Sequence, residues 1–242
     1  MECKADALVL RTADYGESDR MLTLFTLQQG KLSAAAKGVR KAAAKLRFAA
    51  QPFCFAEYVL AKRGERCTVI GATLTDGFYP LREDISKFYA AAALVGVLDA
   101  VLPEGVVNEE LFLRAVNALG QMCEGSEEET LISFLLKVLE LSGYMLTFER
   151  CADCGGELSG RIWFDMQSGC FYCGECARGA GASPSTLNVL RKCAGLAFDA
   201  SLVCKDGYVR ALKLLSAYFF EKTETRVKAL QEYIVLAASQ GA

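Results

Sequence analysis

Hydrophobic and polar residues alternate in short runs over the first third of the chain, a pattern typical of half-buried β-strands. Glycines such as Gly30, Gly38 and Gly64 separate the runs, as turn residues do. The runs cover residues 7–11, 21–27, 31–38, 53–64 and 67–75. Five short strands predict a small antiparallel barrel, with the OB-fold as the leading candidate and an SH3-like barrel as the alternative.

After Pro80 the apolar residues recur at spacings of three and four, the period of an α-helix. The pattern predicts helices over residues 82–102, after Asn108 as N-cap, over residues 126–143, after Ser183 and Pro184, and one or two helices over residues 206–234. Ser126 and Glu129 have the spacing of a capping box. Cores of helical bundles are apolar at this period, so we expect the following side chains to be core: Leu131, Phe134, Leu135, Val138 and Leu141.

These elements predict an α+β protein with three parts. We expect an OB-fold domain at residues 1–80, a helical domain made of residues 81–148 and 179–242, and a cysteine-rich insert at residues 149–178 between its two halves. The chain has 242 residues, of which 52% are hydrophobic, so a substantial core can be buried.

The sequence predicts a cytoplasmic protein without a membrane span. The longest apolar run, Phe88–Leu98, is too short to cross a hydrocarbon core of about 30 Å as a helix, so it is interpreted as a buried helix. The first residues mix charges into an alternating pattern and lack the apolar block of a signal peptide.

Positive charge is concentrated near the N-terminus, although the formal net charge is -2. Residues 1–80 hold 12 Lys and Arg against 8 Asp and Glu, whereas residues 81–242 hold 15 against 21. The stretch KGVRKAAAKLR at residues 37–47 has five basic residues and no acidic one. On spacing alone, Lys37, Lys41 and Lys45 fit a solvated helix face as well as a phosphate-binding loop. The lack of interleaved acidic residues and the position between the third and fourth strands favour the loop.

A small barrel with a positive loop can hold a nucleic-acid backbone, because basic side chains meet phosphates and exposed aromatic rings stack on bases. Tyr15, near the first turn, is the candidate for stacking, whereas Phe25, Phe53 and Phe55 follow strand patterns and are interpreted as core. The candidate phosphate contacts are Arg20, Lys31, Lys37, Arg40, Lys41, Lys45 and Arg47.

Four of the 11 cysteines have the spacing of a metal site. Cys151 and Cys154 form one CxxC pair, and Cys173 and Cys176 form a second, which predicts a four-thiolate structural zinc site. Iron in the same thiolate cage stays an alternative. Cys170 is also three positions before Cys173, but the bulky residues between them favour Cys173 and Cys176 as the second pair. The other cysteines are interpreted as core: Cys3, Cys54, Cys67, Cys123, Cys193 and Cys204.

The sequence gives no indication of enzymatic chemistry. It contains no histidine, which removes the catalytic triads and dyads that need an imidazole. It also has no phosphate loop, dinucleotide fingerprint or cluster of metal-activating carboxylates. We therefore expect a protein that binds other molecules, with no small-molecule substrate and no catalytic residues.

Three stretches resemble the RecO family of bacterial recombination mediators. They are ALVLRTADYGESDRMLTLFT at residues 7–26, GKLSAAAKGVRK at 30–41 with AQPF at 50–53, and CADCG followed by GCFYCGEC. The resemblance covers nearly the whole chain. It implies an OB-fold barrel, a helical body and a zinc-ribbon-like insert. The family commonly has glycine where Cys170 stands, which supports Cys173 and Cys176 as ligands.

The resemblance also implies a function in DNA repair and homologous recombination. Such proteins bind single- and double-stranded DNA, anneal complementary strands coated by single-strand-binding protein and, with the RecR partner, help to load the recombinase. It places Lys37, Arg40 and Lys41 in a DNA-contacting loop and Arg20 in the motif YGESDR, in which Glu17 and Asp19 shape a turn. An alternative is a zinc-stabilised adaptor that docks partners, such as the tail of single-strand-binding protein, on its acidic helical part and binds nucleic acid incidentally.

Overall fold

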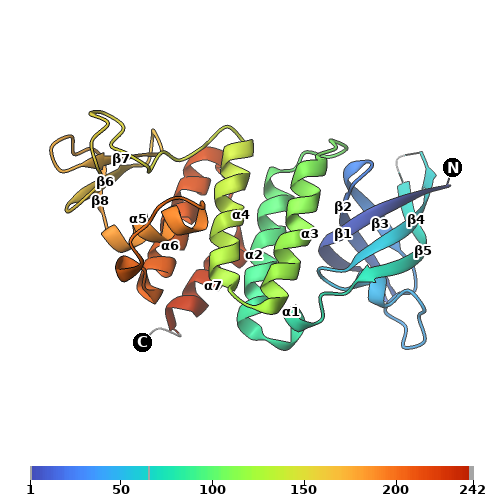
Figure 1. Cartoon of the computed structure of the whole chain (residues 1–242). Helices are drawn as coiled ribbons and strands as arrows, with labels where there is room; N and C mark the ends of the chain where they lie inside the picture. The colour runs from blue at the N-terminus through green and yellow to red at the C-terminus, as the bar shows by residue number, and fades with distance from the viewer. Residues whose placement is uncertain (1, 65, 240–242) are drawn as a thin grey trace. The chain divides into compact units, whose positions relative to one another are not determined.

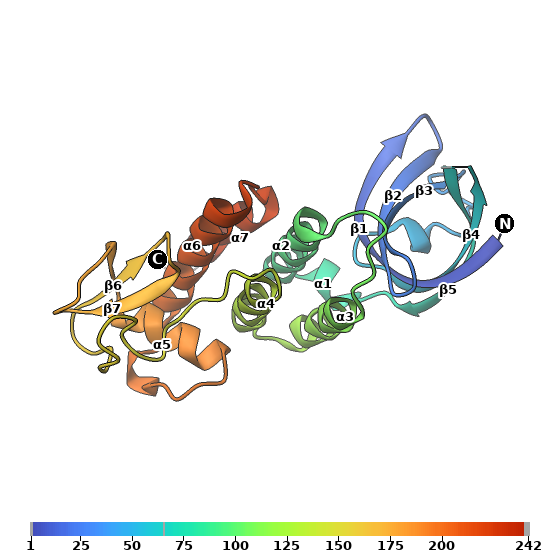
Figure 2. The ribbon, with the colours of Figure 1, turned by 90° about the horizontal axis from the view of Figure 1, so that it is seen from above.

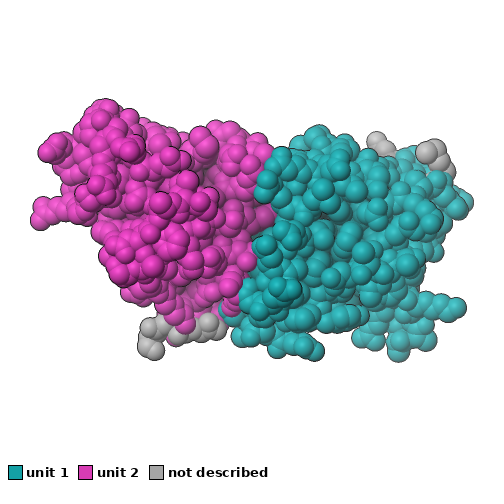
Figure 3. All heavy atoms as spheres, in the orientation of Figure 1, with its two compact units in different colours: residues 1–125 teal, residues 126–242 magenta. Residues whose placement is uncertain are grey.

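The computed structural model describes residues 2–64 and 66–239. These residues form two compact units, which Figure 3 shows in different colours: unit 1 up to residue 125, and unit 2 from residue 126. Each unit has its own β-structure and its own helices (Figure 1).

Unit 1 contains a closed barrel of five strands (Figure 2). The strands are β1 (Glu2–Tyr15), β2 (Asp19–Thr26), β3 (Gly30–Ala36), β4 (Phe55–Arg63) and β5 (Arg66–Asp76). Their order is β1-β2-β3-β5-β4, and β4 pairs with β1. All pairs are antiparallel except that of β3 with β5, which is parallel. This OB-like barrel confirms the predicted fold class.

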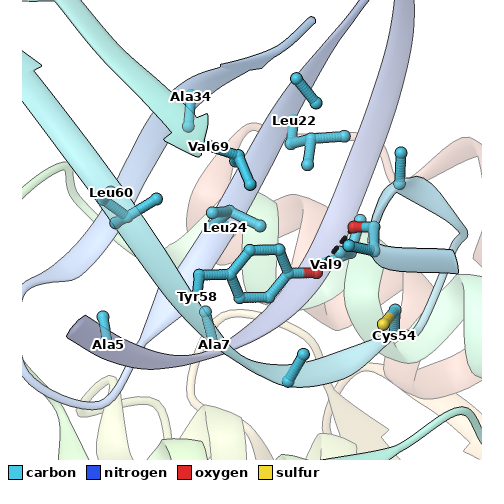
Figure 4. Packing of buried hydrophobic residues seen from close by; sticks show 14 of the residues in the cluster. Ala5, Ala7, Val9, Leu22, Leu24, Ala34, Cys54, Tyr58, Leu60 and Val69 are labelled. Atoms are coloured by element: carbon cyan, nitrogen blue, oxygen red, sulfur yellow. Dashed lines mark hydrogen bonds between the residues drawn. The ribbon is translucent and has the colours of Figure 1, made fainter. Parts of the chain in front are cut away.

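The barrel core follows from the alternation in the strands. Leu22 and Leu24 of β2 point into the barrel and are buried with Tyr58 of β4 (Figure 4). A β-bulge between Val9 and Arg11 shifts the register of β1. Such a bulge bends a strand, and β1 pairs with β4 over its first half and with β2 over its second half.

Three helices complete unit 1: α1 (Pro80–Glu83), α2 (Ile85–Val101) and α3 (Glu109–Glu124). Asn108 caps α3 as predicted, because its side chain accepts a hydrogen bond from the Leu111 N–H. Phe112 of α3 packs edge-on against Phe25 and Phe55, with ring centroids 5.3 and 5.8 Å apart. The helix therefore covers an outer face of the barrel.

The buried helix predicted for residues 88–98 is part of α2. Val95 and Leu98 are buried, whereas Ile85 at the first helical position is 64% exposed. The buried set also contains residues on other sides of the helix, among them Ala90, Ala91 and Leu94. The helix is apolar nearly all round and is buried on most sides, so a single stripe does not describe it.

Unit 2 contains the other four helices of the described residues: α4 (Glu127–Leu141), α5 (Pro184–Cys193), α6 (Lys205–Thr223) and α7 (Lys228–Ser239). The short 3-10 turn η2 (Ala200–Leu202) lies between α5 and α6. The predicted core positions of α4 are buried except Leu141, which is 40% exposed at the last turn. The predicted capping box is wrong: Ser126 has φ +60° and its side chain makes no cap hydrogen bond.

A three-stranded sheet carries the cysteine-rich insert. Its strands are β6 (Ile162–Asp165), β7 (Cys170–Cys173) and β8 (Ala180–Ala182), in the order β7-β6-β8. Phe164 of β6 packs against Tyr218 of α6, with centroids 5.8 Å apart. A Cβ at Gly169 would lie 2.3 Å from the Tyr218 hydroxyl. Glycine at this position therefore leaves room for the Tyr218 side chain. The sheet is thereby fixed to the helices of unit 2.

The structure divides the chain into two compact units, between residues 125 and 126. The sequence predicted three parts, with boundaries at residues 80, 148 and 178. Helices α1–α3 belong to the same unit as the barrel, and the cysteine-rich insert belongs to the same unit as α4–α7. A functional division at residues 80, 148 and 178 stays a prediction. In the part of the chain that the structure describes, no helix is long and apolar enough to span a bilayer.

Candidate nucleic-acid interface and metal centre

Residues 37–47, called the basic loop from here on, connect β3 to β4 as predicted. The chain forms turns here and no α-helix, and the single-turn 3-10 helix η1 (Phe48–Ala50) follows. Backbone N–H groups of Lys41, Ala44 and Arg47 each donate to the carbonyl three residues earlier. The alternative of a solvated helix face is therefore not what the structure forms.

The apolar residues of the segment anchor the loop in the barrel. Val39 is buried in the barrel core, and Leu46 and Phe48 pack against the same core. Lys37, Lys41, Lys45 and Arg47 are exposed. The loop thus separates its longer side chains by polarity: Val39 is buried and Leu46 half-buried, whereas the cations are exposed together with Ala42 and Ala43.

The start of the basic loop is bonded to the turn between β1 and β2. The Gly38 N–H donates to the Asp19 carboxylate at 2.8 Å, and the Arg40 N–H donates to the Ser18 carbonyl at 3.0 Å. The Arg40 guanidinium donates to the Gly16 carbonyl at 3.1 Å. The bond to Gly38 explains why Asp19 stands beside a basic loop, whereas no side-chain contact among the described residues gives Glu17 the turn-shaping role expected for it.

Asp19 is electrostatically coupled to the loop. Hydrogen bonds from the Gly38 N–H and the Ser18 hydroxyl, followed by the charges of Lys37 and Lys41, hold the pKa of Asp19 below its ordinary value. Asp19 therefore stays ionised at neutral pH and shapes the turn, as the sequence predicts.

Arg20 and Arg40 share one carboxylate. Asp14 lies 3.1 Å from the Arg20 guanidinium and 3.2 Å from that of Arg40. Arg20 also donates to the Ala50 carbonyl at 2.9 Å, at the end of the segment. Through Arg40 and Arg20, Asp14 therefore connects both ends of residues 40–50 to the β1–β2 hairpin. No motif in the sequence marks Asp14, although it pairs with Arg20 across the β1–β2 ladder.

Two further candidates occupy different positions. Tyr15, at the end of β1, is 63% exposed and belongs to the same hairpin as Asp19. Lys31 lies at the start of β3, about 20 Å along the strand from Lys37. Its side chain is 14% exposed, and its amine donates to the carbonyl and the carboxylate of Asp99 at 2.7 and 3.3 Å. Tyr15 thus lies in the hairpin whose turn is bonded to the basic loop, whereas Lys31 is bonded to Asp99 away from the loop.

The second site is the cluster of Cys151, Cys154, Cys173 and Cys176, whose sulfur atoms all lie within 4.8 Å of one another. Cys154 and Cys173 have a sulfur separation of 3.8 Å. A tetrahedral zinc ion with Zn–S bonds of about 2.3 Å places its ligands about 3.8 Å apart. The cluster therefore has the donor type, number and spacing that hold a metal ion.

Backbone N–H groups favour the thiolate of Cys151, whereas the hydrogen bond with Cys154 raises the pKa of Cys176 and the pKa of Cys154 is also raised. The Cys173 N–H donates to the Cys151 sulfur and the Gly156 N–H to the Cys154 sulfur, each at 3.4 Å. Backbone N–H groups of Cys154 and Cys173 lower the pKa of Cys151 to about 6. Metal ligands need this ionised form.

Cys170 does not belong to the cluster. It lies at the first position of β7, opposite Asp165, and its sulfur contacts the Ser168 carbonyl at 3.6 Å. Cys173, at the other end of β7, carries its thiol to the cluster. The structure thus brings together the pairs favoured by the sequence.

The remaining cysteines fit the predicted core only in part. Cys54, Cys67 and Cys193 are buried, and Cys3 and Cys123 are half-buried. Cys204 is exposed, so the prediction is wrong for it. It occupies the N-cap position of α6, where its sulfur lies 3.1 Å from the Ser185 hydroxyl.

Comparison with known proteins gives a consistent result over the whole chain. The family model described as "Recombination protein O N terminal" matches residues 1–78, and "Recombination protein O C terminal" matches residues 82–231. A "DNA repair protein RecO" of Alkaliphilus metalliredigens is 35% identical over 243 residues, which cover 98% of this chain and 94% of the relative.

Two more relatives carry the same name. The one from Pelotomaculum thermopropionicum is 37% identical over 76% of this chain and 72% of its own length. The one from Nocardioides sp. is 32% identical over 93% of this chain and 96% of its own length. The similarity therefore includes both the barrel and the helical part.

Proposed function

Because the chain belongs to the RecO family of recombination proteins, we propose that it acts in DNA repair by binding DNA through the basic loop. The phosphate contacts in this proposal are Lys37, Lys41, Lys45 and Arg47, with Arg40 at the edge of the loop and Tyr15 as a stacking platform. Two further candidates for phosphate contact remain. Arg20 lies at the base of the loop, and Lys31 lies on β3, where its amine is bonded to Asp99.

The observation that carries the proposal is the separation of side chains in the loop. Val39 is buried in the barrel, while the Lys37, Lys41 and Lys45 side chains are exposed. Among the described residues, none of these three lysines forms a hydrogen bond or an ion pair that fixes its amine. Flexible, exposed amines on a fixed backbone suit a ligand with many phosphates and no single geometry.

Contacts of this kind recognise the backbone of DNA and carry no sequence information. We propose that the protein uses them to bind single- and double-stranded DNA and to anneal complementary strands coated by single-strand-binding protein. Annealing needs two strands to be held close together and requires no bond to be made or broken in the protein. We therefore propose a binding protein without catalytic residues, which acts with RecR in recombinase loading and works in the cytoplasm.

We further propose that the four-cysteine cluster holds a structural zinc ion. Zinc bound by four thiolates has no open position for substrate, so the ion would connect two turns of the insert. Cys151 and Cys154 would fix the segment before β6, and Cys173 and Cys176 the segment after β7. The insert forms only a small three-stranded sheet, and a metal link supplies stability that a small sheet lacks.

A strand-annealing assay tests the proposed function. Complementary oligonucleotides are coated with single-strand-binding protein, and duplex formation is followed by fluorescence quenching with and without this protein, in the absence of nucleotide. The proposal predicts faster annealing. If the protein binds the coating protein and leaves the annealing rate unchanged, the adaptor alternative replaces it.

A further inference from the structure

We propose that Asp19 is a positioning residue for DNA binding, although its charge has the same sign as that of DNA. This inference rests on the proposed function of the basic loop. A negative side chain next to a phosphate-binding surface weakens binding if charge alone matters. The contacts of Asp19 indicate the opposite outcome, because its carboxylate fixes the loop that carries the lysines.

The place of Asp19 in the sheet explains this role. Arg20 pairs with Ala36, the last residue of β3, so Asp19 lies where the β2–β3 ladder ends. Beyond this point the Gly38 N–H has no strand partner, and it donates to the Asp19 carboxylate at 2.8 Å. Gly38 has φ +67°, a conformation that glycine adopts without steric cost. The Asp19 carboxylate thus takes the place of the backbone carbonyl that a neighbouring strand would offer to the Gly38 N–H.

Three further contacts fix the same turn. The Ser18 hydroxyl donates to the Asp19 carboxylate at 3.0 Å, which orients it toward Gly38. The Ser18 carbonyl in turn accepts the Arg40 N–H at 3.0 Å. Between these two bonds Val39 enters the barrel core. The loop is therefore held on both sides of Val39 by residues of the β1–β2 turn, and Asp19 supplies the only charged acceptor for its described backbone N–H groups.

Asp19 also affects the lysines directly. The charges of Lys37 and Lys41 help to lower the pKa of its carboxyl, so one negative charge interacts with two positive ones. A carboxylate in this position reduces the repulsion between two ammonium groups that must approach the same strand of DNA. Loss of Asp19 would release the turn and let the two lysines move apart.

Glu17 provides a matched control. It is two residues away in the same turn and carries the same charge, and it is exposed. No hydrogen bond or ion pair connects the Glu17 side chain to the other described residues. Replacing Glu17 therefore removes one negative charge near the loop without releasing the turn.

The experiment measures binding of a fluorescent oligothymidine by anisotropy for the full chain and for D19A, E17A and D19N. We expect D19A to bind roughly three- to tenfold more weakly, which corresponds to the loss of one hydrogen bond. E17A should bind as tightly as the natural protein or up to about twofold more tightly. D19N keeps an oxygen acceptor for the Gly38 N–H, so it should restore most of the affinity that D19A loses.

Hydrogen exchange at pH 7 provides a readout that does not depend on DNA. We expect faster exchange in residues 37–47 of D19A and unchanged exchange in E17A. If D19A does not fold, D19E replaces it: the charge is kept but the carboxylate moves, so positioning predicts weaker binding and charge alone predicts no change. The inference is overturned if D19A, or D19E in its place, binds as tightly as E17A. If the natural protein does not bind the oligonucleotide at all, the proposed function fails, and the exchange data still decide whether Asp19 holds the loop.

Discussion

The Tyr58 hydroxyl donates a hydrogen bond to the Ala49 carbonyl at 2.7 Å, from inside the barrel to the end of the segment that follows the basic loop (Figure 4). Tyr58 is fully buried, and burial raises its pKa far above the ordinary tyrosine value, so the hydroxyl stays protonated. One side chain thus both fills the barrel and binds the backbone of η1. The first prediction follows from this double role.

Replacement of Tyr58 by phenylalanine keeps the ring and removes the hydroxyl. The Ala49 carbonyl would then be buried without its partner, which costs about 1–3 kcal/mol. We expect Y58F to lower the free energy of unfolding by this amount in a urea titration. Tyr15→Phe is the control, because Tyr15 is exposed, and it should leave the unfolding midpoint unchanged. Equal stability of the two variants would show that the buried bond contributes nothing.

The second prediction separates the two cysteines of β7. Cys173→Ser removes a proposed zinc ligand, whereas Cys170→Ser changes a thiol outside the cluster. We expect C170S to retain about one zinc ion per chain and C173S to lose most of it. Metal content after gel filtration and the rate of tryptic cleavage within residues 149–178 provide the measurements. Loss of zinc from C170S to the same extent as from C173S would contradict the proposed ligand set.

The third prediction concerns pH. Hydrogen bonds from Gly38 and Ser18 lower the pKa of Asp19 in the folded protein. A carboxyl whose folded pKa is below its unfolded pKa contributes stability that is present above the unfolded value, about 3.9, and is lost as pH falls through the folded value. We therefore expect the amide shift of Gly38 in NMR spectra to be constant from pH 8 to about 5 and to change only below about 3.9. An inflection above that value, or one that persists in D19N, would contradict the assignment.

The sequence predicted the barrel well because its strands alternate in a simple way. In β2, Leu22 and Leu24 at alternate positions lie in the barrel core, whereas Phe25 on the other face is buried against Phe112 of α3. The convergence of the four thiols was also predictable, because two CxxC turns on neighbouring segments bring their sulfurs to one point. In both cases the pattern depends on residues that are close in the sequence.

Contacts between distant residues could not be predicted in the same way. The Lys31 side chain meets Asp99, 68 positions later, and no local pattern connects them. The burial of Val39 between the exposed Lys37 and Arg40 depends on contact with core residues from distant strands, and no pattern within residues 37–47 indicates it. The capping box at Ser126 fails for a local reason, because a residue at φ +60° does not direct its hydroxyl to the first turn.

The central claim is that the exposed lysines of the basic loop bind DNA phosphates. The salt dependence of single-strand binding tests it most directly, since each neutralised phosphate contributes about 0.7 to the log–log slope. If about four to six phosphates are neutralised, the natural protein should have a slope of roughly -3 to -4.

The variant K37Q/K41Q/K45Q removes three of the proposed contacts, and R63Q/R66Q is the control, because Arg63 ends β4 and Arg66 begins β5, and both are exposed outside the basic loop. We predict that the slope of the lysine variant is shallower by about 2 and that the arginine variant keeps the natural slope. A lysine variant that binds with the natural affinity and slope would contradict the claim.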